Sequence, residues 1–119
     1  MSNIFFFDSD EPLRPPAEVE ITALIAEPYP DGSRVRLTLK ITPFQQRPNL
    51  EIYARKVGGP VVAELSVIES MTPDLEFTLH LRGVAETAGD YVLHAELYYA
   101  NRANPQCSRE ITFSIPTPS

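Results

Sequence analysis

Two alternating runs of apolar residues, joined by a polar corner, constrain this fold more than any other feature of the chain. A period of two is what a strand with one buried face requires, whereas a helix needs apolar residues three and four positions apart. The corner between the runs, residues 83–90, holds Gly83 and Gly89 and predicts a loop. The apolar positions are Leu75, Phe77, Leu79 and Leu81 in the first run and Tyr91, Leu93, Ala95, Leu97 and Tyr99 in the second.

The same period predicts five further strands, over residues 18–26, 34–42, 50–57, 61–68 and 107–115. Six prolines lie between the predicted strands, where a missing backbone donor costs least: Pro43, Pro48, Pro60, Pro73, Pro105 and Pro116. The inward positions expected from parity are Val19, Ile21, Ala23, Ile25, Val35, Leu37, Leu39, Ile41, Leu50, Ile52, Ala54, Ala63, Leu65, Val67, Ile111, Phe113 and Ile115.

These patterns predict an all-β chain that forms one antiparallel β-sandwich of about seven strands. We expect residues 1–16 to form an N-terminal arm or edge strand, residues 17–116 the sandwich, and residues 117–119 a short tail. At 119 residues the chain has the length of one ordinary domain and can bury a core of its own.

The corner resembles the E–F corner of immunoglobulin-like and fibronectin-type sandwiches, in which a small residue precedes a Tyr by two positions. Gly89 and Tyr91 match that pattern, whereas Leu93 stands where antibody domains carry a disulfide Cys. The resemblance implies that the Tyr91 hydroxyl bonds to backbone upstream. It also implies that the strands at 50–57 and 91–99 share a sheet with the last strand.

Composition excludes several classes of partner and site. The net charge of −6 argues against nucleic acid and anionic membrane surfaces as partners. A single cysteine, Cys107, cannot form an intrachain disulfide, and its parity predicts a partly buried structural thiol. No apolar run reaches membrane-spanning length, and the first residues lack the pattern of a signal peptide, so we expect a cytoplasmic protein.

Few residues point to catalysis, and we expect no enzyme, no cofactor and no metal site. Phosphate loops, Cys-x-x-Cys pairs and hydrolase motifs are missing from the sequence, and the acidic residues 8–11 lack the pattern of a calcium loop. His80 and His94 occupy outward positions on strands that a sandwich places in opposite sheets. Only a simple hairpin of these two strands would bring the two imidazoles together.

Two surfaces are candidates for interaction. The first is an outward face rich in the residues common at protein interfaces. It comprises Tyr53, Arg55, Val92, His94, Glu96 and Tyr98. The second is the N-terminal arm Ile4, Phe5, Phe6 and Phe7, which either packs on its own sandwich as an edge strand or docks on a neighbouring chain. Loops or the arm could equally cover the first face.

The expected function is a non-enzymatic module for protein interaction or self-association, with homodimerisation through the arm or the tyrosine face. One alternative is a domain that binds a small molecule or carbohydrate through Tyr29 and Asn101 in its loops. Another is an enzyme in which His80, His94 or clustered acids meet in a cleft. Three outward cations, Arg34, Arg36 and Lys40, form either a solvated stripe or an anion site.

Overall fold

The computed structural model describes residues 12–82, 84 and 86–117 of the chain. These residues form a single turn of 3₁₀ helix, Pro16–Glu18, followed by seven strands. The strands are β1 (Ile21–Pro28), β2 (Arg34–Ile41), β3 (Asn49–Lys56), β4 (Val61–Val67), β5 (Asp74–His80), β6 (Gly89–Tyr98) and β7 (Cys107–Ile115).

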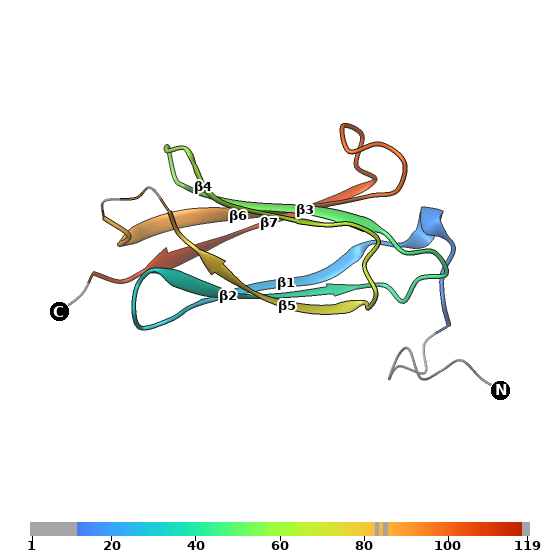
Figure 1. The fold of residues 1–119 in the computed structure, drawn as a ribbon, viewed down its shortest axis with the longest axis horizontal. Coiled ribbons are helices and arrows are strands. Elements are labelled where there is room, and N and C mark those ends of the chain that lie inside the picture. The colour runs from blue at the N-terminus through green and yellow to red at the C-terminus, as the bar shows by residue number, and fades with distance from the viewer. Residues whose placement is uncertain (1–11, 83, 85, 118–119) are drawn as a thin grey trace.

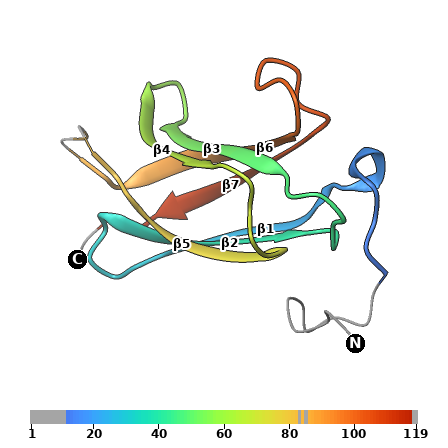
Figure 2. The ribbon, with the colours of Figure 1, turned by 45° about the vertical axis from the view of Figure 1, so that its right-hand side comes forward.

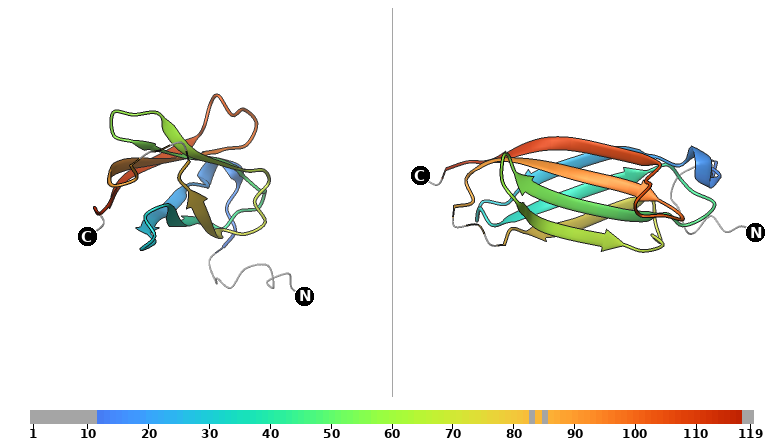
Figure 3. Two further views of the ribbon diagram at one scale, coloured as in Figure 1. Left: turned by 60° about the vertical axis from the view of Figure 1, so that its left-hand side comes forward. Right: turned by 90° about the horizontal axis from the view of Figure 1, so that it is seen from above.

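The strands pack as two antiparallel sheets face to face (Figures 1 and 3). One sheet has the order β1-β2-β5 and the other the order β4-β3-β6-β7. The predicted β-sandwich is confirmed, as is the expectation that β3, β6 and β7 share a sheet. In constant-type immunoglobulin domains the fourth strand belongs to the sheet of the first, second and fifth. Here β4 pairs with β3 instead and widens the second sheet.

The core lies between the sheets and follows the predicted alternation most closely in β2, β3 and β6. In β2, β3 and β6 each predicted inward side chain is at most 4% exposed. These side chains are Val35, Leu37, Leu39, Ile41, Leu50, Ile52, Ala54, Tyr91, Leu93, Ala95 and Leu97. Burying one aliphatic side chain of this size contributes about 1.5–3 kcal/mol, so these strands supply most of the hydrophobic stabilisation. Phe44 in the β2–β3 connection is also buried, a position that the alternation of the strands did not indicate.

Strand β1 departs from the predicted alternation because of a β-bulge. Ile21 pairs with Ile41, but the next pair is Ala23 with Lys40, so Thr22 is an extra residue in the ladder. A bulge moves the following side chains to the opposite face. The expectation that Ala23 and Ile25 point inward is therefore wrong: Ile25 is 46% exposed, whereas Leu24 is 6% exposed and lies in the core.

The ends of β1 also differ from the prediction. Residue 18 belongs to the 3₁₀ turn and not to the strand, since Pro15 and Pro16 fix the backbone at the entry of that turn. At the other end the strand extends to Pro28, which pairs with Val35. An edge strand tolerates a proline because the missing donor faces away from the ladder.

A second bulge lies in β4. Ala54 pairs with Ala63 and Arg55 with Val61, so Val62 is the extra residue. Val62 turns into the core, while Val61 is exposed on the outer face. The predicted inward residues of this strand, Ala63, Leu65 and Val67, pack partly buried against the core.

The corner before β6 has the tyrosine arrangement that the resemblance implied. The buried Tyr91 hydroxyl donates a hydrogen bond of 2.6 Å to the carbonyl oxygen of Thr87, and its ring stacks on Phe113 at 5.2 Å. Gly89 has φ +135°, a conformation that favours glycine. This corner ties the entry of β6 to its sheet.

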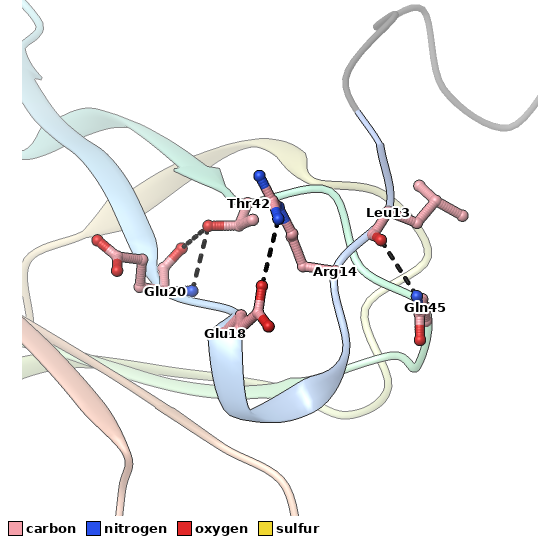
Figure 4. A network of polar contacts seen from close by, with 6 residues as sticks. All are labelled: Leu13, Arg14, Glu18, Glu20, Thr42 and Gln45. Atoms are coloured by element: carbon pink, nitrogen blue, oxygen red, sulfur yellow. Dashed lines mark hydrogen bonds and ion pairs between the residues drawn. The ribbon is translucent and has the colours of Figure 1, made fainter.

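The described chain begins beside the β2–β3 connection (Figure 4). The Arg14 amide donates to the carbonyl oxygen of Pro43, and Gln45 donates through its side chain to the carbonyl oxygen of Leu13. Thr42 and Glu20 exchange two further hydrogen bonds (Figure 4). The candidate arm Ile4, Phe5, Phe6 and Phe7 lies outside the described residues.

Candidate binding cleft on the four-stranded sheet

The register of the four-stranded sheet brings most of the predicted interaction surface together. On its outer face Tyr53 pairs with His94, and Arg55 pairs with Val92. Glu51 pairs with Glu96 in the next row, and Asn49 pairs with Tyr98 at the end. Adjacent rows on one face put these side chains within contact range, so β3 and β6 form one continuous surface.

Two members of the predicted surface are less exposed than expected. Val92 and Tyr98 are each 8% exposed, although both point to the outer side of the sheet. Val92 lies between Arg55 on β3 and Thr112 on β7, and Tyr98 lies beside the β6–β7 loop. This burial depends on the neighbouring strands and the β6–β7 loop, which parity along one strand does not reveal. The accessible part of the predicted surface therefore consists of the partly exposed residues Tyr53, Arg55, His94 and Glu96.

The His94 side chain is held in place by three contacts. Its ring stacks on Tyr53 with the centroids 4.9 Å apart. Its Nε2 atom lies 3.0 Å from Oε2 of Glu96, and its Nδ1 atom lies 3.2 Å from Oε2 of Glu110. Both ring nitrogens are thus engaged with carboxylates, and the imidazole acts as a brace for Tyr53 and Glu96.

Glu51 is a buried carboxylate on the same face. It is 8% exposed, and its Oε1 atom accepts a hydrogen bond of 2.8 Å from the Ser66 hydroxyl on β4. Nη2 of Arg102, from the β6–β7 loop, lies 3.0 Å from the same oxygen. A carboxylate removed from water needs such partners. The Arg102 side chain is itself 66% exposed, so the pair combines a buried anion with a solvated cation.

A cleft of about 560 Å³ opens above Glu51, between the outer face of β3 and β4 and the β6–β7 loop. Figure 2 shows the β3–β4 turn and the β6–β7 loop rising on the outer side of the sheet, toward its opposite ends. The lining residues are Glu51, Ile52, Tyr53, Val61, Glu64, Glu96, Asn101, Arg102 and Ala103.

The loop that forms one wall of the cleft is anchored where it leaves β6. The Tyr99 hydroxyl donates to the carbonyl oxygen of Gln46, and Asn49 donates to the carbonyl oxygen of Tyr99. Burial raises the pKa of Tyr99 to about 12. Within the loop, Asn101 Oδ1 accepts from the amide of Ala103 in a local turn. The loop backbone is therefore defined, while the Arg102 side chain extends from it over the sheet.

The cleft carries an excess of negative charge. Three carboxylates line it, from Glu51, Glu64 and Glu96, against the one guanidinium of Arg102. Glu51 and Glu96 are direct cross-strand partners on the same face, and like charges in that position destabilise a sheet. Departures from local rules of this kind concentrate at functional sites. Glu64 and Arg102 were not indicated as site residues, because parity places Glu64 on an outer face without showing its neighbours, and loop positions have no parity.

The other sequence candidates do not converge. His80 lies on β5 and His94 on β6, in opposite sheets, as the sandwich predicted. Tyr29 lies in the β1–β2 turn, where Arg34 stacks over its ring, whereas Asn101 lies at the far end of the other sheet (Figure 1). The expectation of one loop site using Tyr29 and Asn101 is therefore wrong, because β1 and β2 meet at the end of the sandwich opposite the β6–β7 loop.

The three outward cations of β2 each have an acidic partner. Arg34 pairs with Asp31 at 2.6 Å, Lys40 pairs with Asp74 at 3.2 Å, and Arg36 pairs with Glu76. Because each cation is paired with a carboxylate, these three residues fit a solvated outer face better than an anion site. Cys107 is partly buried, and its sulfur accepts from the amide of Ile21 on β1, which fits a structural thiol.

Within residues 12–82, 84 and 86–117, no group of three or more His, Cys, Asp or Glu side chains is placed to hold a metal ion. The same residues contain no helix with the length and hydropathy to span a membrane. A second hollow of similar size lies between the edges of β4 and β5, lined by Val62, Leu79 and His80 among others.

Comparison with protein-family models gave no match, and neither did comparison with curated protein sequences. Several solved glycosidases contain a similar fold. The β-glucuronidase of Bifidobacterium dentium, solved with coumarin-3-O-glucuronide, has a TM-score of 0.58 at 16% identity over 84% of this chain. The β-glucuronidases of Ruminococcus gnavus and Lactobacillus rhamnosus give TM-scores of 0.55 and 0.52 at 13% and 12% identity, each over 82% of this chain.

The match covers only 16–18% of those three enzyme chains. The chain therefore corresponds in size to one β-sandwich within much larger proteins. At these identities the likeness establishes the fold and nothing about the residues of a site.

Proposed function

We propose that this chain is a non-catalytic binding module whose ligand surface is the outer face of β3 and β6 together with the cleft above Glu51. The observation that carries the proposal is the buried Glu51 carboxylate, which lies at the floor of an open cleft beside the Tyr53 ring. Concave sites with a few convergent polar groups and an aromatic wall are typical of binding sites.

The geometry of the acidic and basic groups supports binding over catalysis. His94 is engaged through both ring nitrogens, and Glu51 is engaged by Ser66 and Arg102. A general base needs a free lone pair directed at the reacting group, and a nucleophile needs an adjacent base. The described lining of the cleft includes no Ser, Thr, Cys, Lys or His side chain that could act as a nucleophile or as its base.

A protein partner suits this surface best. Tyr53 and Arg55 are half-buried side chains on a rigid strand, and Tyr and Arg are the residue types that carry most binding energy at protein interfaces. The hydroxyl of Tyr53 makes no hydrogen bond with the described part of the chain, so it is available to a partner. Self-association through this face is one form of the same proposal.

The proposal is tested by selecting binders from an unbiased peptide library on the wild-type protein and counter-screening them on two variants. Tyr53→Ala removes the aromatic wall, and we expect it to weaken most selected binders at least tenfold. Arg36→Ala is the control, because it removes an exposed side chain from the outer face of the other sheet. Equal losses for both variants, or binders unaffected by Tyr53→Ala, would overturn the assignment of this face.

A second candidate is carbohydrate binding, which the likeness to β-glucuronidase sandwiches and the polar cleft beside Tyr53 both favour. The excess of carboxylates opposes an anionic sugar, so a neutral glycan is the expected ligand class. Titration of labelled protein with a neutral oligosaccharide and with glucuronic acid separates the cases. Shifts at Tyr53 and Asn101 with the neutral sugar alone support this candidate, and no shift with either removes it.

A further inference from the structure

The strongest indication of what the cleft binds is the side chain that already occupies it. Arg102 reaches from the β6–β7 loop and sets its guanidinium 3.0 Å from the buried Glu51 carboxylate. The rest of that side chain is solvated, and the carboxylate is the only partner of the guanidinium among the described residues. A group held by its tip alone, on a loop, is readily exchanged for a similar group from outside.

The charge in the cleft is only partly compensated by Arg102. Glu51 and Glu96 face each other across the strands, Glu64 also lines the cleft, and the one guanidinium in the lining pairs with Glu51 alone. His94 contacts Glu96 along β6, and no contact between His94 and Glu51 joins the two within the described residues. A second cation would therefore be attracted, and a cation that displaced Arg102 would lose none of this attraction.

The chemistry of the lining favours a guanidinium over other cations. A guanidinium is planar, bonds carboxylates through two parallel donors, and stacks on aromatic rings. The cleft offers the Glu51 carboxylate at its floor and the Tyr53 ring as a wall. A metal ion would need several converging ligands, which the described residues do not provide here.

We propose that the cleft is a receptor for an arginine side chain of a protein partner, and that Arg102 is its intramolecular occupant, which the partner's arginine displaces. This proposal rests on the proposed function and specifies the ligand chemistry of the same site. Arg102 competes with an incoming guanidinium for Glu51. The apparent affinity for that guanidinium is therefore the intrinsic affinity multiplied by the fraction of molecules in which Arg102 has left the site.

The test is a titration of the isotope-labelled full chain with acetyl-arginine amide, followed by NMR. Acetyl-citrulline amide is the matched probe, since it keeps the shape of arginine and removes the charge. We expect the arginine probe to shift the amides of Glu51, Tyr53 and Arg102, and the citrulline probe to leave them unchanged.

Three variants make the test specific. Arg102→Ala should raise the affinity for the arginine probe about fivefold, the factor that corresponds to a partly exposed ion pair. Lys40→Ala removes the same charge from the opposite sheet and should leave the affinity unchanged. Glu51→Gln, which keeps an acceptor for Ser66 and the shape of the side chain, should abolish the shifts.

Three results would overturn the proposal: equal binding of citrulline, equal effects of Arg102→Ala and Lys40→Ala, or binding that survives Glu51→Gln in a folded protein. If the library selects peptides that lack arginine and still require Tyr53, this inference is wrong and the proposed binding face is retained. If neither the arginine probe nor any library peptide binds this face, the proposed function is wrong as well.

Discussion

Replacing Tyr91 with Phe isolates one hydrogen bond of the corner before β6. The variant keeps the ring, its stacking on Phe113 and its buried area, and loses only the 2.6 Å bond to the Thr87 carbonyl oxygen. A buried hydrogen bond contributes about 0.5–1.5 kcal/mol net, and an abandoned buried acceptor costs about 1–3 kcal/mol. Thr87 is only half-buried, so water can reach its carbonyl in part. We therefore expect a loss of about 1–2 kcal/mol in the free energy of unfolding.

The assay is urea denaturation of the wild-type protein and two Tyr→Phe variants at pH 7. Tyr91→Phe should lower the midpoint without changing the slope, since the surface exposed on unfolding stays the same. Tyr53→Phe is the control, because that hydroxyl makes no hydrogen bond with the described residues, and it should fall within about 0.5 kcal/mol of wild type. If Tyr91→Phe is no less stable than this control, the hydroxyl does not stabilise the corner.

Three further predictions concern the turns and the chain start. Gly89→Ala should cost about 1–2 kcal/mol in urea denaturation, since a φ of +135° is strained for any residue with a Cβ atom, whereas the flexible end of Lys56 can move away from the new methyl group. Stability equal to wild type would contradict this. Hydrogen bonds from the Ser33 amide and the Arg34 side chain lower the pKa of Asp31 to about 2. The stability from Asp31 should therefore be present above pH 4 and lost as the pH falls toward 2, and Asp31→Asn should remove this part of the acid dependence. Removing residues 1–11 should convert a dimer into a folded monomer by light scattering, and a full chain that is already monomeric refutes that expectation.

The strands of this sandwich could be predicted because their pattern is local. In β2 every second residue from Val35 to Ile41 is apolar, and all four are buried. Any pairing that buries one face of such a strand produces that result, whatever the neighbours are. The tyrosine corner was predictable for a similar reason, because Tyr91 and its acceptor on Thr87 lie four residues apart.

The faces of β1 and β4 could be predicted only in part, because a bulge is a property of two paired strands and not of one strand: Ala63, Leu65 and Val67 pack against the core as expected, whereas Ile25 does not. Nothing in the sequence around Thr22 or Val62 shows that a residue is extra until the partner strand is aligned with it. The side of the sandwich on which β4 lies is likewise decided by the pairing with β3. Parity therefore failed at Ile25 and missed Val62.

The binding cleft divides in the same way between sequence and tertiary structure. The sequence by itself determined that Tyr53 and His94 point outward, since a period of two assigns each side chain of a strand to a face. Only the tertiary structure decided that Glu51 is buried beneath Arg102, 51 positions further along the chain, and that Glu64 and Glu96 flank them. Charges separated in sequence become neighbours through strand register and loop path, and both are set by long-range packing that no local pattern contains.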